Sequence, residues 1–532
     1  MRRSVADRRV SETRTWWLAL PVPARLAIIL GLGLLVRLAL IPVGGYGSDL
    51  RIMREWGSRL LTEPMSRFYA TDEVVDHLPG DLWLLWLLGH AADLMSPGAR
   101  LPNAALKLVP VLADLGLGGV LFLIGQRLAG PRTGLVAAGF IALNPALIFL
   151  SAIWGQWDAV SALLAMVALW LLLRGDLPWA LPALAWAILI KPQFAAWLPL
   201  FMVAIWHGGG LSPGAGRTRL WRGLLGTANA LLLAALLLLP FDVGIGPMAT
   251  TWDLIERLRY SLDYYPETTL NAFNLWATSL AGNRESDAQL LLGVAVRVWG
   301  TLLFVAAYLL ILVRLWRWPS TPDVVWALFA VSFTSFMLPT RIHERYLLPA
   351  VVLAALVAAL APRCRWFAVA LSFTYLANIY WSYDKRYLAL EIDSLYDGNL
   401  FIYEIALLNV GLLAFALTRL GSILHNSGSS GGLDGLPPVA GGASEVADEI
   451  PPVGCGRPPA SSTLETSDAG HGPGRLVART PRAGRTRRTP GSRAGCTRRR
   501  ASVASRDCPG PARRAPRQRL CTRTGRLAGN GR

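Results

Sequence analysis

The residues of this chain best suited to chemistry gather in one short segment, LPTRIHERYLLPA, at positions 338–350. Arg341, His343 and Arg345 stand there beside runs of Val, Ala, Leu and Phe. All three side chains can donate hydrogen bonds to one anion, and Arg in particular binds phosphate through two parallel N–H groups. Glu344 could orient an Arg or the His. Charged groups beside apolar sequence cost free energy unless a partner compensates them. The segment predicts an anion-binding site; the alternative is a basic loop that only sets membrane topology, which would need neither His nor Glu.

Composition predicts the setting of this cluster, an integral membrane protein. The 532 residues are 53% hydrophobic and 16% charged, with a mean hydropathy of +0.41, far from a typical soluble domain. Apolar runs recur between residues 15 and 420, and we expect about 11 to 13 of them to span the membrane. The predicted fold class is therefore all-α, a polytopic transmembrane helix bundle over residues 15–425. Whether Pro192 splits the run at 179–206 into two helices is left open.

The start of the chain predicts its orientation. The first apolar run is too long for a signal peptide and lacks an A-x-A cleavage site, so we interpret it as the first helix. The basic segment at 1–14 is predicted to be cytoplasmic by the positive-inside rule. The loops at 44–77 and 241–287 are then predicted to be external.

The net charge of +18 resides mainly in the C-terminal tail. Residues 431–532 hold 19 Arg against 7 Asp and Glu, a net charge of +12, which leaves +6 for the rest of the chain. The segment 426–532 is rich in Arg, Gly and Pro without apolar periodicity, so we expect a disordered tail. The alternative is a module for nucleic acid or anionic lipid; like-charge blocks more often are solvated, so no nucleic-acid partner is predicted.

Two polar clusters lie beside the first predicted spans. GGYGSDLRIMREWGSRL at 44–60 predicts an amphipathic interfacial helix with Asp49 near its start, where the alternative role for Asp49 is a helix N-cap. VVDHLPGDLWLLW at 74–86 places Asp76 and His77 directly before a span whose first turn contains Pro79. Ionisable residues at such positions are functional candidates.

Two further clusters combine aromatic and polar side chains. SAIWGQWDAVSALL at 151–164 holds Gln156 and Asp158 between apolar helices, where an interfacial aromatic belt and a helix cap are the alternatives. The loop at 241–287 mixes aromatic faces, amides and a carboxylate, as sugar-binding clefts and also surface loops do. Its candidate residues are Tyr265, Glu267, Asn271 and Asn274.

In these motifs the sequence resembles the GT-C superfamily of polytopic glycosyltransferases, which use polyprenyl- or dolichyl-phosphate sugars. It is similar in particular to bacterial mannosyltransferase-like proteins and to dolichyl-phosphate-glucose glucosyltransferases. The resemblance covers roughly residues 15 to 420. It rests on the order of four elements: Asp49 with Trp56, Asp76-His77-Leu78-Pro79, Gly155 to Asp158, and His343-Glu344-Arg345.

The resemblance implies a reaction and roles for these residues. The protein would transfer a hexose, with mannose as the leading candidate, from a polyprenyl-phosphate donor to a lipid-linked or cell-envelope glycan. The transfer would invert the anomeric carbon and take place at the external face of the cell membrane. Asp49 would be the general base. Arg341, His343 and Arg345 would bind the donor phosphate, with Glu344 orienting them. The acceptor or sugar cleft would consist of Asp76, His77, Gln156, Asp158, Tyr265, Glu267, Asn271 and Asn274.

Other functions remain open at this stage. A transporter or flippase of a lipid-linked or anionic substrate would also explain the spans and the anion site, although we see no internal repeat. A non-catalytic membrane subunit would not need both a base and an anion site. No cofactor is predicted with certainty: a divalent metal is possible, but no ligand spacing demands one.

Overall fold

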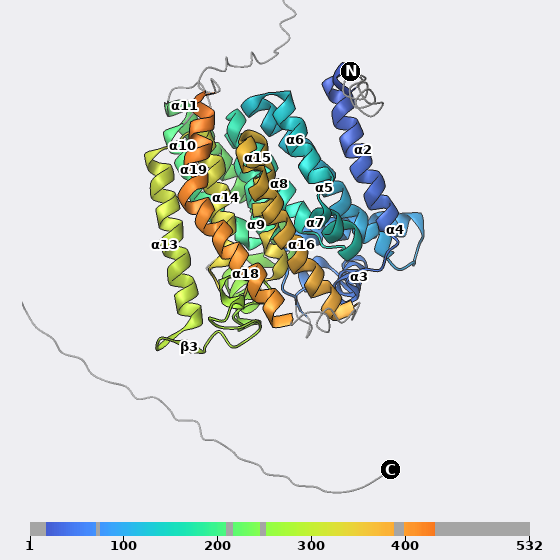
Figure 1. The fold of residues 1–532 in the computed structure, drawn as a ribbon. Coiled ribbons are helices and arrows are strands. Elements are labelled where there is room, and N and C mark those ends of the chain that lie inside the picture. The colour runs from blue at the N-terminus through green and yellow to red at the C-terminus, as the bar shows by residue number, and fades with distance from the viewer. Residues whose placement is uncertain (1–16, 71–74, 209–215, 245–251, 388–397, 431–532) are drawn as a thin grey trace, which may run out of the picture. The chain divides into compact units, whose positions relative to one another are not determined.

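The computed structural model describes residues 17–70, 75–208, 216–244, 252–387 and 398–430. Contacts divide the chain into two units, Met1–Gly442 and Ala443–Arg532, and the first contains every described residue (Figure 1). The predicted cytoplasmic segment at 1–14 and residues 431–532 of the predicted tail lie outside the described residues. Residues 426–430 belong to the last helix, so helical structure continues slightly beyond the boundary predicted at 425.

Within the described residues, five helical segments are long and apolar enough to cross a membrane, judged by length and composition. A sixth is a bent pair whose two parts meet at 44°. The five are α2 (Val22–Leu40), α5 (Asn103–Ala129), α11 (Gly216–Leu238) with η4 (Leu239–Phe241), α13 (Val296–Arg317), and α18 (Gly398–Phe415) with η9 (Ala416–Leu420) and α19 (Gly421–Ser430). The bent pair joins α6 (Pro131–Ala142) to α7 (Pro145–Ile148) and the π-helical turn η2 (Phe149–Trp154).

The remaining bundle helices are shorter or less apolar, so this criterion counts fewer full spans than the 11 to 13 predicted. Prolines and polar residues divide the apolar runs: the run at 179–206 is interrupted at Lys191 and Pro192. These helices are α4 (Pro79–Met95), α8 (Asp158–Arg174), α9 (Leu177–Ile190), η3 (Pro192–Trp197), α10 (Leu198–His207), α14 (Thr321–Met337), α15 (Leu348–Leu360) and α16 (Arg365–Tyr387).

The connecting segments contain short elements that build the polar part of the molecule. The predicted amphipathic helix is present as α3 (Gly47–Thr62). The strands β1 (Val243–Gly244) and β2 (Trp252–Asp253) pair in parallel, whereas β3 (Leu290–Leu291) and β4 (Val294–Ala295) form an antiparallel hairpin. The other short elements are η1 (Met65–Arg67), α12 (Leu254–Asp263), η6 (Leu275–Ala277), η7 (Glu344–Leu347) and η8 (Pro362–Cys364).

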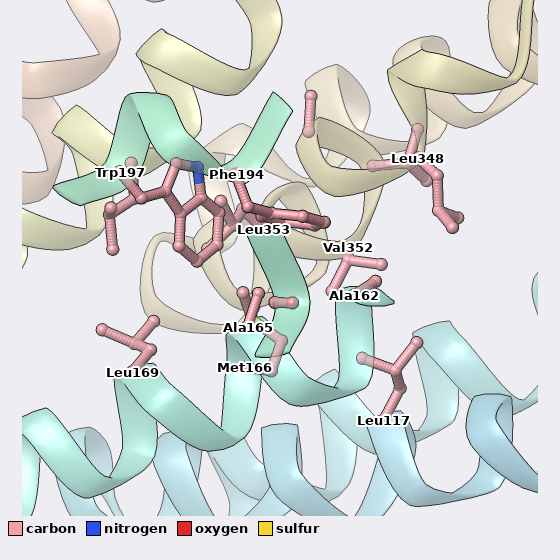
Figure 2. Packing of buried hydrophobic residues seen from close by; sticks show 14 of the residues in the cluster. Leu117, Ala162, Ala165, Met166, Leu169, Phe194, Trp197, Leu348, Val352 and Leu353 are labelled. Carbon is pink, nitrogen blue, oxygen red and sulfur yellow. The ribbon is translucent and has the colours of Figure 1, made fainter. Parts of the chain in front are cut away.

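The apolar core lies around α14 and α15, which are buried along nearly their whole length. Leu348 and Val352 pack there in one buried cluster with residues of α5, α8 and η3 (Figure 2). The outer helices α2, α11 and α13 instead expose apolar side chains, such as Leu310, which is 72% exposed. Large exposed apolar helix faces suit hydrocarbon rather than water. The chain is a multi-pass helical membrane protein.

Two buried cations join α2, α5 and the connection that leads into α3. Arg37 on α2 pairs with Asp114 on α5 at 3.0 Å and donates to the Ala142 carbonyl at 2.6 Å. Lys107 on α5 donates to the carbonyls of Val43 and Gly44, both at 2.6 Å. Those carbonyls belong to the short connection between α2 and α3. These bonds therefore anchor the start of α3, which carries Asp49.

Candidate active site

A polar cavity of about 350 Å³ opens between α3, the start of α4, the η2–α8 connection, the loop after α12 and η7. These segments are far apart in the sequence, and tertiary packing brings them together. The cavity is lined by most of the predicted site residues, namely Asp49, Asp76, His77, Gln156, Tyr265, Asn271, His343, Glu344 and Arg345. Arg341, Asp158, Glu267 and Asn274 are not among its lining residues.

Asp49 lies in the first turn of α3. The N-cap residue is Tyr46, so the alternative role of Asp49 as the N-cap is wrong. Asp49 Oδ2 accepts hydrogen bonds from Trp154 Nε1 at 3.2 Å and from Gln156 Nε2. Gly155 permits this arrangement because its φ of +93° is left-handed and an added Cβ would lie 2.9 Å from a Leu50 methyl carbon. The G-Q motif thus fixes one carboxylate oxygen of Asp49.

Arg345 is the guanidinium that reaches the cavity from the HER motif. Its Nη1 lies 3.3 Å from Glu344 Oε1, and its Nε lies 3.7 Å from Asp158 Oδ2. Asp158, only 2% exposed, also pairs with Lys191 at 3.6 Å. Burial lowers the pKa of Arg345, but the Glu344 and Asp158 carboxylates raise it by more, so the group stays charged. Asp158 therefore supports the cation from behind the cavity wall.

His343 also lines the cavity, but it does not supply positive charge. Burial holds the pKa of His343 well below its ordinary value, and the charges of Arg345 and Lys191 lower it further. The ring lies against Tyr265 and Tyr346, with centroids at 5.5 and 5.3 Å. A neutral imidazole at pH 7 can still donate or accept a hydrogen bond. His343 therefore adds no positive charge to the predicted cluster of Arg341, His343 and Arg345.

Arg341 is engaged in structural contacts away from the cavity. Its Nε binds Asp287 Oδ2 at 2.6 Å, and its Nη1 binds Asp263 Oδ1 and the Leu262 carbonyl, both at 2.8 Å. Its backbone φ of +63° turns the side chain toward these acceptors. Arg341 ties α12 and the loop before β3 to the segment His343-Glu344-Arg345, and it is not among the residues that line the cavity.

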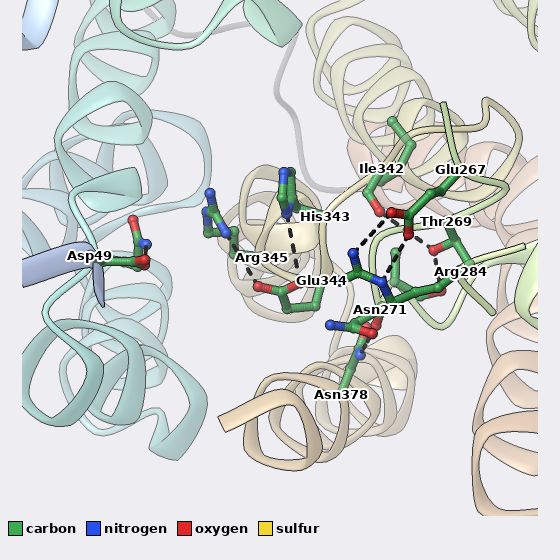
Figure 3. Close-up of polar contacts among 12 residues, drawn as sticks. Asp49, Glu267, Thr269, Asn271, Arg284, Ile342, His343, Glu344, Arg345 and Asn378 are labelled. Carbon is green, nitrogen blue, oxygen red and sulfur yellow. Dashed lines mark hydrogen bonds and ion pairs between the residues drawn. The ribbon is translucent and has the colours of Figure 1, made fainter. Parts of the chain in front are cut away.

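Glu267 and Asn274 lie outside the cavity wall, and of the two Glu267 contacts a residue that lines it. Glu267 Oε1 accepts a hydrogen bond from Arg284 Nη2 at 2.9 Å, and Oε2 lies 2.8 Å from Arg284 Nε, so this ion pair holds the guanidinium at the cavity wall. Asn274 is fully buried; its side chain caps η6 and donates to the carbonyls of Phe336 and Pro339. Figure 3 shows Glu267 and Arg284 on one side of the HER residues and Asp49 on the other.

A second cavity of about 740 Å³ adjoins the first. The two share four wall residues, which are Tyr46, Ser48, Asn271 and Arg284. The two cavities are therefore adjacent, and Arg284 lines both of them.

No sequence pattern indicated Arg284 or Tyr46, whereas Trp154 belongs to the polar and aromatic cluster predicted at 151–164. Tyr46 stacks on Trp154 with ring centroids 4.5 Å apart and an interplanar angle of 10°. Arg284 stands in an irregular loop, and its partner Glu267 is 17 residues away, so no spacing signals the pair. The segment KPQ at 191–193 places a basic residue between two apolar runs, which is a weak sequence signal for Lys191. Among the described residues, no group of three or more His, Cys, Asp or Glu side chains is placed to hold a metal ion.

No protein-family model matches this sequence, and no curated protein matches it. Solved structures similar to it include ArnT from Cupriavidus metallidurans bound to undecaprenyl phosphate, at 13% identity and a TM-score of 0.41, over 76% of this chain and 78% of ArnT. The Archaeoglobus fulgidus oligosaccharyltransferase is similar in its complex with zinc and sulfate, at 15% identity and a TM-score of 0.33, over 76% of this chain and 51% of that protein. Its apo form gives 14% identity and a TM-score of 0.34 over 56% of its length. The likeness concerns overall fold, and at these values it carries no functional argument.

Proposed function

We propose that the chain is a membrane glycosyltransferase that moves a hexose, with mannose as the first candidate, from a polyprenyl-phosphate donor to a lipid-linked or cell-envelope glycan. The observation that supports this most strongly is the content of one cavity. The same space is lined by Asp49, with one carboxylate oxygen held by Trp154 and Gln156, and by Arg345, a cation that is 14% exposed. Sugar transfer from a phosphate leaving group needs both a base and an anion site.

The reaction assigns each group a step. The acceptor hydroxyl oxygen attacks the anomeric carbon, the bond from that carbon to the phosphate oxygen breaks, and the hydroxyl proton passes to Asp49. Asp49 Oδ2 is occupied by its two donors, so Oδ1 is the oxygen placed to take the proton; its contact with Ser48 Oγ is long, at 3.4 Å. Attack opposite the leaving phosphate inverts the anomeric carbon.

The leaving group gains negative charge as the bond breaks, because a phosphodiester becomes a phosphomonoester. A preorganised cation stabilises this developing charge more than the charge of the bound donor. Arg345 fits that role, since Glu344 holds its guanidinium by a hydrogen bond and Asp158 lies 3.7 Å from its Nε before any ligand binds. Arg284, at the junction of the two cavities, supports binding of the acceptor in the larger one.

The test is transfer by the purified full chain in lipid nanodiscs. Polyprenyl-phosphate mannose, glucose and arabinose are supplied separately with a cell lipid extract, and the label in the acceptor is measured together with released polyprenyl phosphate. We expect equal amounts of both products from one donor, and about 10² to 10⁴ times slower formation of both by the Asp49→Asn variant. Movement of intact donor across a proteoliposome membrane without release of polyprenyl phosphate would instead establish a flippase.

A further inference from the structure

A histidine–carboxylate pair at the cavity wall has no role in the reaction described above. His77 Nδ1 lies 2.5 Å from Asp81 Oδ2 across one turn at the start of α4. The side chain of Asp81 is 3% exposed and that of His77 is 21% exposed, and of the two His77 lines the cavity. Trp56 packs against the imidazole with centroids 5.0 Å apart. Because Asp81 occupies Nδ1, Nε2 is the ring nitrogen placed to meet a ligand.

The packing of α4 explains why this carboxylate is buried. At Gly80, an added Cβ would lie 2.5 Å from the Leu189 carbonyl oxygen, so α4 approaches the end of α9 directly at its first turn. Asp81 Oδ1 is buried without a hydrogen-bond partner among the described residues. A buried carboxylate with one close partner favours a positive charge on that partner. Burial lowers the pKa of His77, but the Asp81 and Asp76 carboxylates together raise it by more, so the net shift is upward.

The charges of the residues that line the cavity favour a further cationic contact for a phosphate there. The carboxylates lining it are Asp49, Asp76 and Glu344, whereas the guanidiniums are Arg284 and Arg345. Three acidic groups against two basic ones form a poor site for an anion.

We propose that His77, held as an imidazolium by Asp81, is the second cationic contact to the donor phosphate, beside Arg345. His77 Nε2–H donates to a phosphate oxygen. Asp81 is a positioning residue that acts through the imidazole. The inference rests on the proposed function. It moves His77 from the predicted acceptor cleft to the donor site and fills the place that Arg341 and neutral His343 leave.

Binding of undecaprenyl phosphate to the purified full chain in detergent tests the proposal. His77→Gln keeps a hydrogen-bond donor near Nε2 but removes the charge, and we expect the Kd to rise about ten- to a hundredfold. Asp81→Asn should also weaken binding. The matched control is His90→Gln on the same helix: His90 Nδ1 contacts the Trp86 carbonyl at 2.9 Å, and the residue is not among those lining the cavity. Its Kd should stay at the wild-type value.

The pH dependence of binding distinguishes a charge from a purely structural role. The charged groups that act on His77 are Asp81 and Asp76, which raise its pKa, and Lys191, which lowers it. Since the imidazolium is lost as pH rises through a raised pKa, the affinity ratio of wild type to His77→Gln should fall with increasing pH. Above the second pKa of a phosphate monoester, about 6, the lipid phosphate stays a dianion, so a fall of the ratio in that range reports the imidazolium. In Asp81→Asn the same loss of affinity should occur at lower pH.

The outcomes separate this inference from the proposed function. Wild-type affinity in His77→Gln, or an affinity ratio that does not change with pH, overturns the role of His77 while Arg345→Gln still loses affinity and the proposed function stands. If the wild-type chain does not bind undecaprenyl phosphate at all, both are overturned. Should His77→Gln fail to elute as one species in gel filtration, Asp81→Asn and the wild-type pH profile decide.

Discussion

Replacing Asp49 by Asn removes the proposed general base while keeping the hydrogen bonds that hold the side chain. Asn has nearly the same size, and its Oδ1 can still accept from Trp154 Nε1 and Gln156 Nε2. Changing a charged acceptor to a neutral one in these bonds costs about 1 to 2 kcal/mol of stability. The N-cap of α3 is Tyr46 and is unaffected. The variant should therefore insert and elute like the wild type.

The effect on turnover should be much larger than the effect on stability. Loss of a positioned general base lowers rates by about 10² to 10⁴, which corresponds to about 3 to 5 kcal/mol in activation free energy. Donor binding depends on Arg345 rather than on Asp49, so the donor Kd should change by no more than a few fold. The proposed reaction predicts this separation of turnover from binding.

The assay measures sugar transfer and donor affinity side by side for wild type, Asp49→Asn and a matched control. Glu55→Gln is that control, because Glu55 lies on the same helix, is 44% exposed, and pairs with the solvent-exposed Arg51. Removing an exposed pair costs at most about 1 kcal/mol, and transfer should persist. Transfer at nearly the wild-type rate in Asp49→Asn would refute the assignment. The search for the base would then turn to Asp76, because Asp158 is ion-paired behind the cavity wall.

Further predictions follow from the described contacts. Arg345→Ala should lower kcat/KM for transfer by about ten- to a hundredfold, and Lys should restore it only in part; an unchanged value would remove Arg345 from the donor site. Arg341→Ala should instead lower the melting temperature, since it leaves Asp287, 1% exposed, without its 2.6 Å partner at a cost of about 3 kcal/mol, while donor Kd in the folded fraction stays unchanged. Folding lowers the pKa of His343, so its contribution to the free energy of unfolding is complete above the ordinary histidine pKa of about 6.5 and is lost as pH falls below that value. His343→Gln should therefore make the melting temperature depend less on pH in this acidic range. A chain ending at Ser430 should insert and keep transfer activity, and complete loss of activity with normal insertion would contradict this.

Local sequence was sufficient for the features that depend on neighbouring residues. Apolar runs indicated a helical membrane bundle, the pattern at 44–60 indicated the amphipathic helix α3, and Pro79 marked the first turn of α4. Most polar residues chosen at helix ends do line one cavity, because ionisable side chains beside apolar helices tend to gather where a polar space accommodates them.

Contacts between distant segments were decided by tertiary structure alone. Arg341 and Arg345 are four residues apart in one motif, yet the first binds Asp287 and Asp263 outside the cavity while the second lines it. The charge of His343 depends on burial and on cations from other segments, which no spacing encodes. The sequence pattern predicts which residue types lie at the end of a helix. Which charge meets which partner is determined by how the helices pack, because electrostatic energies depend on distance and burial.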